Sequence, residues 1–158
     1  TRLLTPYKDR CQVSHPARLP AALRRCYSTD INRKWLDMAK VFSEAKYDFL
    51  LKPEMRSFGE VLIHSASGNV YASKAGRGEK VKWDELDPKQ FKTKAEIVAE
   101  FEKSAADADA AFKATEAEKP NTVEPWMGVM QHSSEHYGLL VAYFRANGIV
   151  PPESRPKT

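Results

Sequence analysis

Apolar side chains recur at steps of three and four residues through most of this chain, and this spacing limits its fold more than any other feature. Such spacing lines up apolar residues on one face of an α-helix, whereas a half-buried strand needs strict alternation. No segment shows convincing alternation, and breaks rich in proline or glycine divide the pattern into four parts. The 158 residues suffice to bury one core. We therefore predict an all-α fold, a four-helix bundle.

The first two helices have recognisable starts. The first is expected from Asp30, as N-cap, to Pro53, which closes the segment. The second begins at Ser57, with Glu60 three residues later in the spacing of a capping box, and runs to about Ser73. The apolar stripe of the first helix consists of Trp35, Met38, Ala39, Phe42, Ala45 and Phe49.

The third helix follows a long connection, residues 74–92. A connection of this length can line one end of a bundle and allows helices that do not simply alternate up and down. Thr93 and Glu96 form a second capping box, and the helix should reach about Ala117. Its apolar stripe consists of Ile97, Phe101, Ala105, Ala108 and Phe112.

The fourth helix has two apolar stripes. It should start near Pro125 and end at Asn147, with Gly148 as the C′ residue. So wide an apolar arc indicates contacts on two sides, from its own bundle and from a second subunit, and we expect a homodimer. One stripe consists of Val129, His132, His136, Leu140 and Tyr143. The other consists of Trp126, Met130, Tyr137, Val141 and Phe144.

The positive charge of the chain lies in its first part. The formal net charge is +4, but residues 1–30 alone hold six basic and two acidic side chains, so residues 31–158 are neutral. We interpret 1–30 as a basic, mostly irregular arm and 31–158 as the bundle. A neutral body argues against nucleic-acid binding, and no apolar run is long enough to span a membrane. Cys11 and Cys26, both in the arm, are interpreted as free thiols in preference to a disulfide or a metal site with His15.

Three histidines are the candidate functional residues. His132 and His136 are four residues apart, so both lie on one face of the fourth helix, and His64 falls on the inward face of the second. Imidazoles that converge from two helices can hold a divalent metal ion, here Zn, Ni, Fe or Mn, and leave a coordination position open. Glu135 follows His132 by three positions instead of one, so the zinc-protease motif is absent.

A purely structural role is the alternative for each histidine. A lone His64 would favour that role, as a buried residue with a satisfied hydrogen bond. His132 and His136 together favour the metal site, because two inward imidazoles without a metal would each need a polar partner in the core.

Four further residues lie near the histidines along the two helices. Glu60 lies one turn before His64 and could orient it, but a role as capping-box partner is favoured. Asn69 and Tyr71 could line a pocket, and Tyr143 is expected in the core. No catalytic residue is assigned.

Three stretches together resemble the DinB-like superfamily, over about residues 32–156. They are Ser57-Phe58-Gly59-Glu60 followed by His64, His132-Ser-Ser-Glu-His136-Tyr-Gly, and Tyr143-Phe-Arg-Ala-Asn-Gly-Ile-Val-Pro-Pro152. The resemblance implies a four-helix bundle, commonly dimeric, that binds a divalent metal through a histidine triad. By motif, the triad is His64, His132 and His136.

The resemblance also implies a range of activities. Some members of the superfamily resemble metal-dependent transferases or isomerases that use low-molecular-weight thiols, and others resemble hydrolases. We expect a metal-dependent enzyme that activates a small thiol or water for reaction with a small-molecule substrate. The alternatives are a metal-dependent hydrolase, a non-catalytic metal-binding or stress-related protein, and a plain bundle with structural histidines. We expect a cytoplasmic protein, with an exported form as the alternative because some relatives carry a secretory signal.

Overall fold

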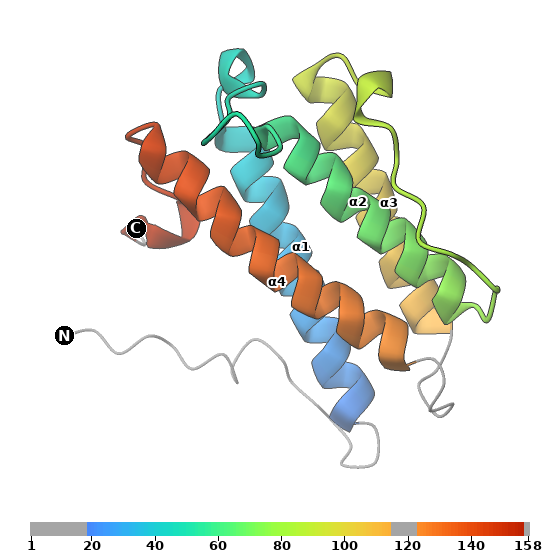
Figure 1. The fold of residues 1–158 in the computed structure, drawn as a ribbon. Coiled ribbons are helices and arrows are strands. Elements are labelled where there is room, and N and C mark those ends of the chain that lie inside the picture. The colour runs from blue at the N-terminus through green and yellow to red at the C-terminus, as the bar shows by residue number, and fades with distance from the viewer. Residues whose placement is uncertain (1–18, 115–122, 157–158) are drawn as a thin grey trace.

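Four helices make up the fold, which confirms the all-α prediction. The computed structural model describes residues 19–114 and 123–156, and within these ranges it contains no strand (Figure 1). The helices are α1 (Leu19–Val41), α2 (Phe58–Gly76), α3 (Lys94–Ala114) and α4 (Val123–Ala146). Short 3₁₀ turns are η3 (Glu44–Lys46), η4 (Pro88–Gln90) and η6 (Pro152–Ser154).

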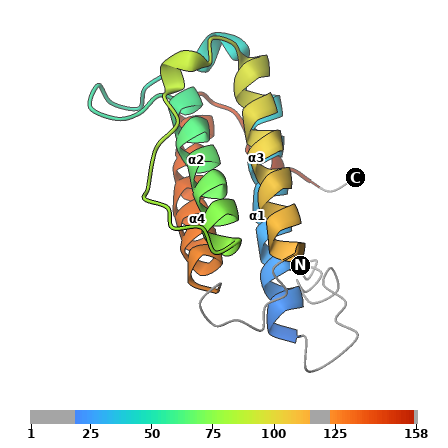
Figure 2. The ribbon, with the colours of Figure 1, turned by 90° about the vertical axis from the view of Figure 1, so that its right-hand side faces the viewer.

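The helices form two layers, α2 with α4 and α1 with α3 (Figure 2). α2 packs against α3 and α4, and α1 packs against the same two helices. α1 and α4 run in one direction, and α2 and α3 run in the other (Figure 1). The connection between α2 and α3 therefore returns along the length of the bundle. This confirms that the helices do not simply alternate, although the connection follows the side of α2 instead of closing one end (Figure 2).

The predicted start of the first helix is wrong. α1 begins at Leu19, so residues 19–30 of the predicted irregular arm are helical. Asp30 lies inside the helix instead of capping it, and its carboxylate pairs with Arg33 at 3.0 Å and with Lys34 at 2.7 Å. These i,i+3 and i,i+4 pairs stabilise the helix interior where a cap was expected. Residues 1–18, the rest of the arm, lie outside the described residues.

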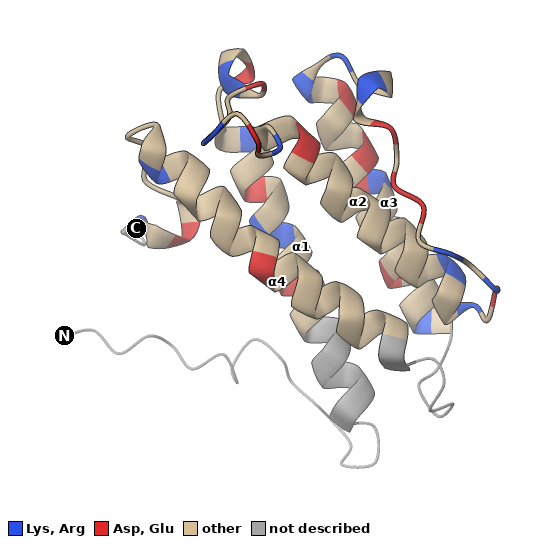
Figure 3. Ribbon diagram, viewed as in Figure 1, with Lys and Arg blue, Asp and Glu red and all other residues tan. Residues whose placement is uncertain are grey.

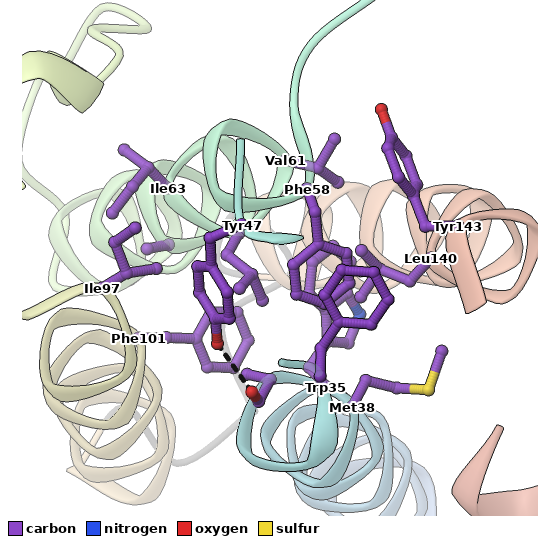
Figure 4. Packing of buried hydrophobic residues seen from close by; sticks show 14 of the residues in the cluster. Trp35, Met38, Tyr47, Phe58, Val61, Ile63, Ile97, Phe101, Leu140 and Tyr143 are labelled. Carbon is purple, nitrogen blue, oxygen red and sulfur yellow. Dashed lines mark hydrogen bonds between the residues drawn. The ribbon is translucent and has the colours of Figure 1, made fainter. Parts of the chain in front are cut away.

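The first helix also ends earlier than predicted, at Val41, because groups from elsewhere in the fold bind its last carbonyls. The Tyr47 hydroxyl donates to the Ala39 carbonyl at 2.6 Å (Figure 4). The Lys94 ammonium donates to the carbonyls of Lys40 and Phe42, each at 2.7 Å. Satisfied carbonyls need no further helical turn. The stripe residues Ala45 and Phe49 consequently lie beyond the helix.

The other predicted helix ends are largely confirmed. Ser57 Oγ accepts from the Glu60 amide at 3.3 Å, and the Glu60 carboxylate accepts from the Ser57 amide at 2.6 Å. Thr93 and Glu96 form the second reciprocal box, at 3.2 and 3.0 Å. Gly148 follows α4 with φ of +69°, a left-handed conformation that favours glycine at a helix end. The predicted end of the third helix, near Ala117, lies outside the described residues.

Large aromatic side chains fill the centre of the bundle. Phe42 and Phe58 stack with ring centroids 3.9 Å apart, and Trp35 stacks on Phe101 at 5.5 Å. These residues belong to one buried cluster to which all four helices contribute (Figure 4). A second, smaller cluster consists of Ala72, Ala108, Ala111, Phe112, Trp126 and Val129. On α4, the two candidate histidines fall between the residues of the two clusters.

Both apolar stripes of α4 find partners within the chain. Leu140 and Tyr143 of the first stripe belong to the large buried cluster, and Trp126 of the second packs edge-on against Phe112 of α3 at 5.0 Å. The wide apolar arc is thus explained by contacts inside one bundle. The homodimer stays a prediction, without support from this arc. Among the described helices, none combines the length and apolarity needed to cross a membrane.

Candidate metal centre

Three histidines converge between α2 and α4, as their helical spacing predicted. His64 lies on α2, and His132 and His136 lie one turn apart on α4. One possible ligand atom from each residue lies within 4.8 Å of the other two. The Nε2 atoms of His64 and His132 are 2.8 Å apart, and the three ring centroids are 4.4–4.9 Å apart. The group can hold one metal ion.

A glycine allows the two helices to approach closely at this level. A Cβ added at Gly68 on α2 would lie 3.1 Å from Val129 Cγ2 and 3.5 Å from His132 Nδ1. The first contact is tighter than most real Cβ contacts, and the second is ordinary van der Waals contact. A residue without a side chain therefore brings the backbone of α2 beside the His132 ring, and the imidazoles of the two helices can meet.

The connection between α2 and α3 supplies a carboxylate that sequence reasoning missed. Glu85 Oε1 lies 3.1 Å from His64 Nδ1, and Glu85 Oε2 lies 3.1 Å from an Arg56 guanidinium nitrogen. The contact with His64 is within ion-pair distance but does not meet hydrogen-bond geometry. A carboxylate beside the second ring nitrogen of a metal-binding histidine typically orients the ring and raises its basicity. Glu60, the residue considered for this role from the sequence, instead completes its capping box.

Burial keeps two of the imidazoles uncharged. Desolvation, together with the charges of His136 and His64, lowers the pKa of His132 from 6.5 to about 4. Desolvation, followed by the charges of His64 and Arg56, also lowers the pKa of His136. At neutral pH both rings therefore carry a free lone pair, which is the form that binds a metal.

The residues fit a divalent transition metal. His132 Nε2 faces His64 Nε2, whereas His132 Nδ1 is buried without a hydrogen-bond partner among the described residues, so the two Nε2 atoms are the candidate ligand atoms. A tetrahedral ion with bonds of about 2.0–2.1 Å to nitrogen would separate two ligand nitrogens by about 3.3 Å. The Nε2 atoms of His64 and His132, at 2.8 Å, need only a small displacement to reach that spacing. Neutral imidazoles suit Zn, Fe and Ni alike.

A cavity of about 440 Å³ adjoins the histidines. It is lined by Gly68, Tyr71, Trp83, Pro125, Gly128, Val129 and His132. Trp83, from the connection, lies with its ring centroid 5.7 Å from His64 and 5.9 Å from His132. Tyr71 lines this cavity, as its position on α2 suggested, whereas Asn69 is buried and is not among the lining residues.

Tyr143 lies in the core, as predicted, and also contacts the backbone of a residue beside the site. It is fully buried, and its hydroxyl donates to the Arg56 carbonyl. Arg56 in turn binds Glu85, the carboxylate beside His64. The hydrogen bond from Tyr143 thus fixes the backbone of Arg56, whose guanidinium binds Glu85.

Few charged residues surround the site. On α2 only Glu60 and Lys74 carry charge, and charges gather instead on α1, α3 and the connection (Figure 3). The formal charges that act on the α4 histidines are those of Glu135, on the same helix, Arg56 and, for His136, Glu85. Arg56 and Glu85 offset each other through their ion pair, and Glu135 adds a negative charge beside the α4 histidines.

Comparison with known proteins leaves the family open. No family model and no curated protein matches this chain. The likeness to the DinB-like superfamily therefore rests on three sequence stretches, two that contain the histidines and one from Tyr143 to Pro152.

Proposed function

We propose that this chain is a divalent-metal-binding bundle protein of the DinB-like kind, with His64, His132 and His136 as ligands. The observation that carries the proposal is the convergence of three ligand atoms within 4.8 Å from two helices. The lowered pKa values of His132 and His136 support it, since uncharged rings need not release a proton to bind a metal. Glu85 beside His64 completes the arrangement expected around a metal-binding histidine.

We further propose that the centre is catalytic and activates a small thiol or water. A divalent ion held by three imidazoles retains an open position and lowers the pKa of a thiol or water bound there. Glu85, held by Arg56, would keep His64 oriented while the reaction proceeds. The cavity beside His132 offers room for a second reactant. A storage or purely structural centre has no need of such a cavity, and this favours an enzyme.

The thiol transferase reaction is the first choice and hydrolysis the second. Both use the same centre and differ only in the nucleophile. Thiol transfer follows from the resemblance, and the largely apolar cavity suits an electrophile with an apolar body. A non-catalytic metal-binding protein remains the third candidate.

One comparison separates these functions. Metal-loaded protein is incubated with cysteine or glutathione and chlorodinitrobenzene, and separately with neutral ester and amide substrates. The proposal predicts metal-dependent thiol conjugation that is lost in His136→Ala. Hydrolysis alone would establish the second candidate. No metal-dependent turnover in either reaction, with the metal bound, would favour the non-catalytic protein.

A further inference from the structure

The geometry points to the cavity beside His132 as a binding site for a small, uncharged molecule with a planar apolar body. The cavity, of about 440 Å³, has a size typical of pockets that enclose small ligands. The inference deepens the proposed function by naming a substrate class. It rests on that function only for the role of the neighbouring histidines.

The walls of the cavity indicate an uncharged ligand. None of the described residues that line it carries a formal charge. The nearest carboxylate beside the histidines, Glu85, is already engaged by Arg56 and His64. In the metal-free protein a charged ligand would lose hydration here without gaining an opposite charge, which is costly.

Two aromatic rings indicate a planar ligand. The centroids of Trp83 and Tyr71 lie 5.9 Å apart, with their planes at 54°. Trp83 is 47% exposed although a tryptophan usually buries most of its surface, so part of the indole is available for contact. Aromatic rings stack on or meet the edges of planar groups at such separations. Gly68 and Gly128 line the cavity without side chains of their own and leave it open.

His132 indicates which end of the cavity adjoins the three-histidine group. This residue lines the cavity and also belongs to the three-histidine group. Its Nδ1 is buried without a hydrogen-bond partner among the described residues. Since Nδ1 itself has almost no accessible surface, the ligand is placed by its position in the cavity, and a reactive group at the His132 end would lie next to the centre.

A pair of fluorescent probes tests the charge and shape of the ligand. N-phenylnaphthylamine is planar and uncharged, and anilinonaphthalenesulfonate has nearly the same rings with an added sulfonate. The inference predicts saturable binding of the neutral probe to the metal-free full-length protein, with affinity at least about tenfold above that of the sulfonate. No saturable binding, or equal affinity for both probes, would overturn it.

Two glycines of α4 provide matched variants. Gly128 lines the cavity and Gly138 does not, and an added Cβ meets nothing within 4 Å at either position. Gly128→Leu should weaken binding of the neutral probe by at least about tenfold because the side chain fills the cavity. Gly138→Leu should leave it unchanged. Both variants should fold, since leucine favours helix over glycine. Trp83→Ala, which removes one wall, should also weaken binding, and unchanged binding in both cavity variants would contradict the inference.

His136→Ala distinguishes failure of this inference from failure of the proposed function. His136 belongs to the three-histidine group but does not line the cavity. The neutral probe should therefore bind to this variant as it does to the unaltered protein, with or without metal. Probe binding by a protein that never binds metal would leave the cavity assignment standing and contradict the proposed function alone.

Discussion

His64 Nδ1 lies 3.1 Å from Glu85 Oε1, and this contact joins α2 to the irregular connection that follows it. The other oxygen of Glu85 binds Arg56, which immediately precedes the cap of α2. The connection is therefore attached to the bundle at the level of the histidines. The same stretch places Trp83 against the His64 and His132 rings, so the long connection forms part of the site.

Replacing Glu85 by glutamine should weaken metal binding. The amide keeps the shape of the side chain but cannot stabilise the ligating form of His64 as a carboxylate does. Loss of such a partner typically lowers metal affinity about 10–100-fold. Competition with a chelator of known affinity measures the change.

The neighbouring Asp84 provides the control. It is exposed, and Asp84→Asn removes the same charge from the same segment. Its metal affinity should stay close to that of the unaltered protein. Equal weakening in both variants would mean that net charge, and not the contact with His64, governs affinity.

Replacing Trp35 by phenylalanine should destabilise the bundle. Trp35 is fully buried, stacks on Phe101, and donates to the Ser133 carbonyl next to His132. The change loses the hydrogen bond and part of the packed volume, so the free energy of unfolding should fall by about 1–3 kcal/mol. Urea unfolding measures it. Trp83→Phe, at a site that is 47% exposed, should change the free energy of unfolding by no more than about 0.5 kcal/mol.

The metal-free protein should lose stability as the pH falls from about 6.5 to about 4. The pKa of His132 is about 4 in the folded protein and near 6.5 when unfolded. Within this window the unfolded chain binds a proton that the folded one does not, so the free energy of unfolding decreases with decreasing pH. His132→Gln should show a shallower dependence. The same slope in both proteins would show that the folded pKa of His132 is not lowered.

Replacing Gly76 by alanine should destabilise the end of α2. An added Cβ would lie 2.3 Å from Cζ2 of Trp126, whose ring is buried. Overpacking of this kind costs about 1–3 kcal/mol. Gly138→Ala, which meets nothing within 4 Å, should instead stabilise α4 by about 0.5–1 kcal/mol. A lower thermal unfolding temperature in Gly76→Ala and a higher one in Gly138→Ala would confirm the contact.

Helical periodicity predicts the part of the site that lies on helices. The spacing of His132 and His136, together with the inward phase of His64, is enough to bring the three together, because the side-chain direction of a regular helix follows from residue number. The capping boxes at Ser57 and Thr93 are local motifs of four residues, and the structure contains both.

Features that depend on tertiary contacts could not be predicted from sequence patterns. Glu85 and Trp83 lie in an irregular segment whose path depends on the whole bundle, so their spacing carries no signal of contact with His64. The end of α1 depends on Tyr47 and Lys94, which bind its carbonyls from outside the helix. Its early start at Leu19 was obscured because the prolines of the arm and the acidic Asp30 both suggested a later one.

The metal content of untagged protein tests the central claim most directly. Elemental analysis after purification, followed by titration with Zn, Ni, Fe and Mn, should show one ion bound per chain. Metal binding should be lost in His132→Ala and His136→Ala, with helicity largely retained. It should be kept in His15→Ala, which alters the one histidine of the sequence outside the proposed site. Absence of any stoichiometric metal in the purified protein, with none bound on titration, would contradict the account.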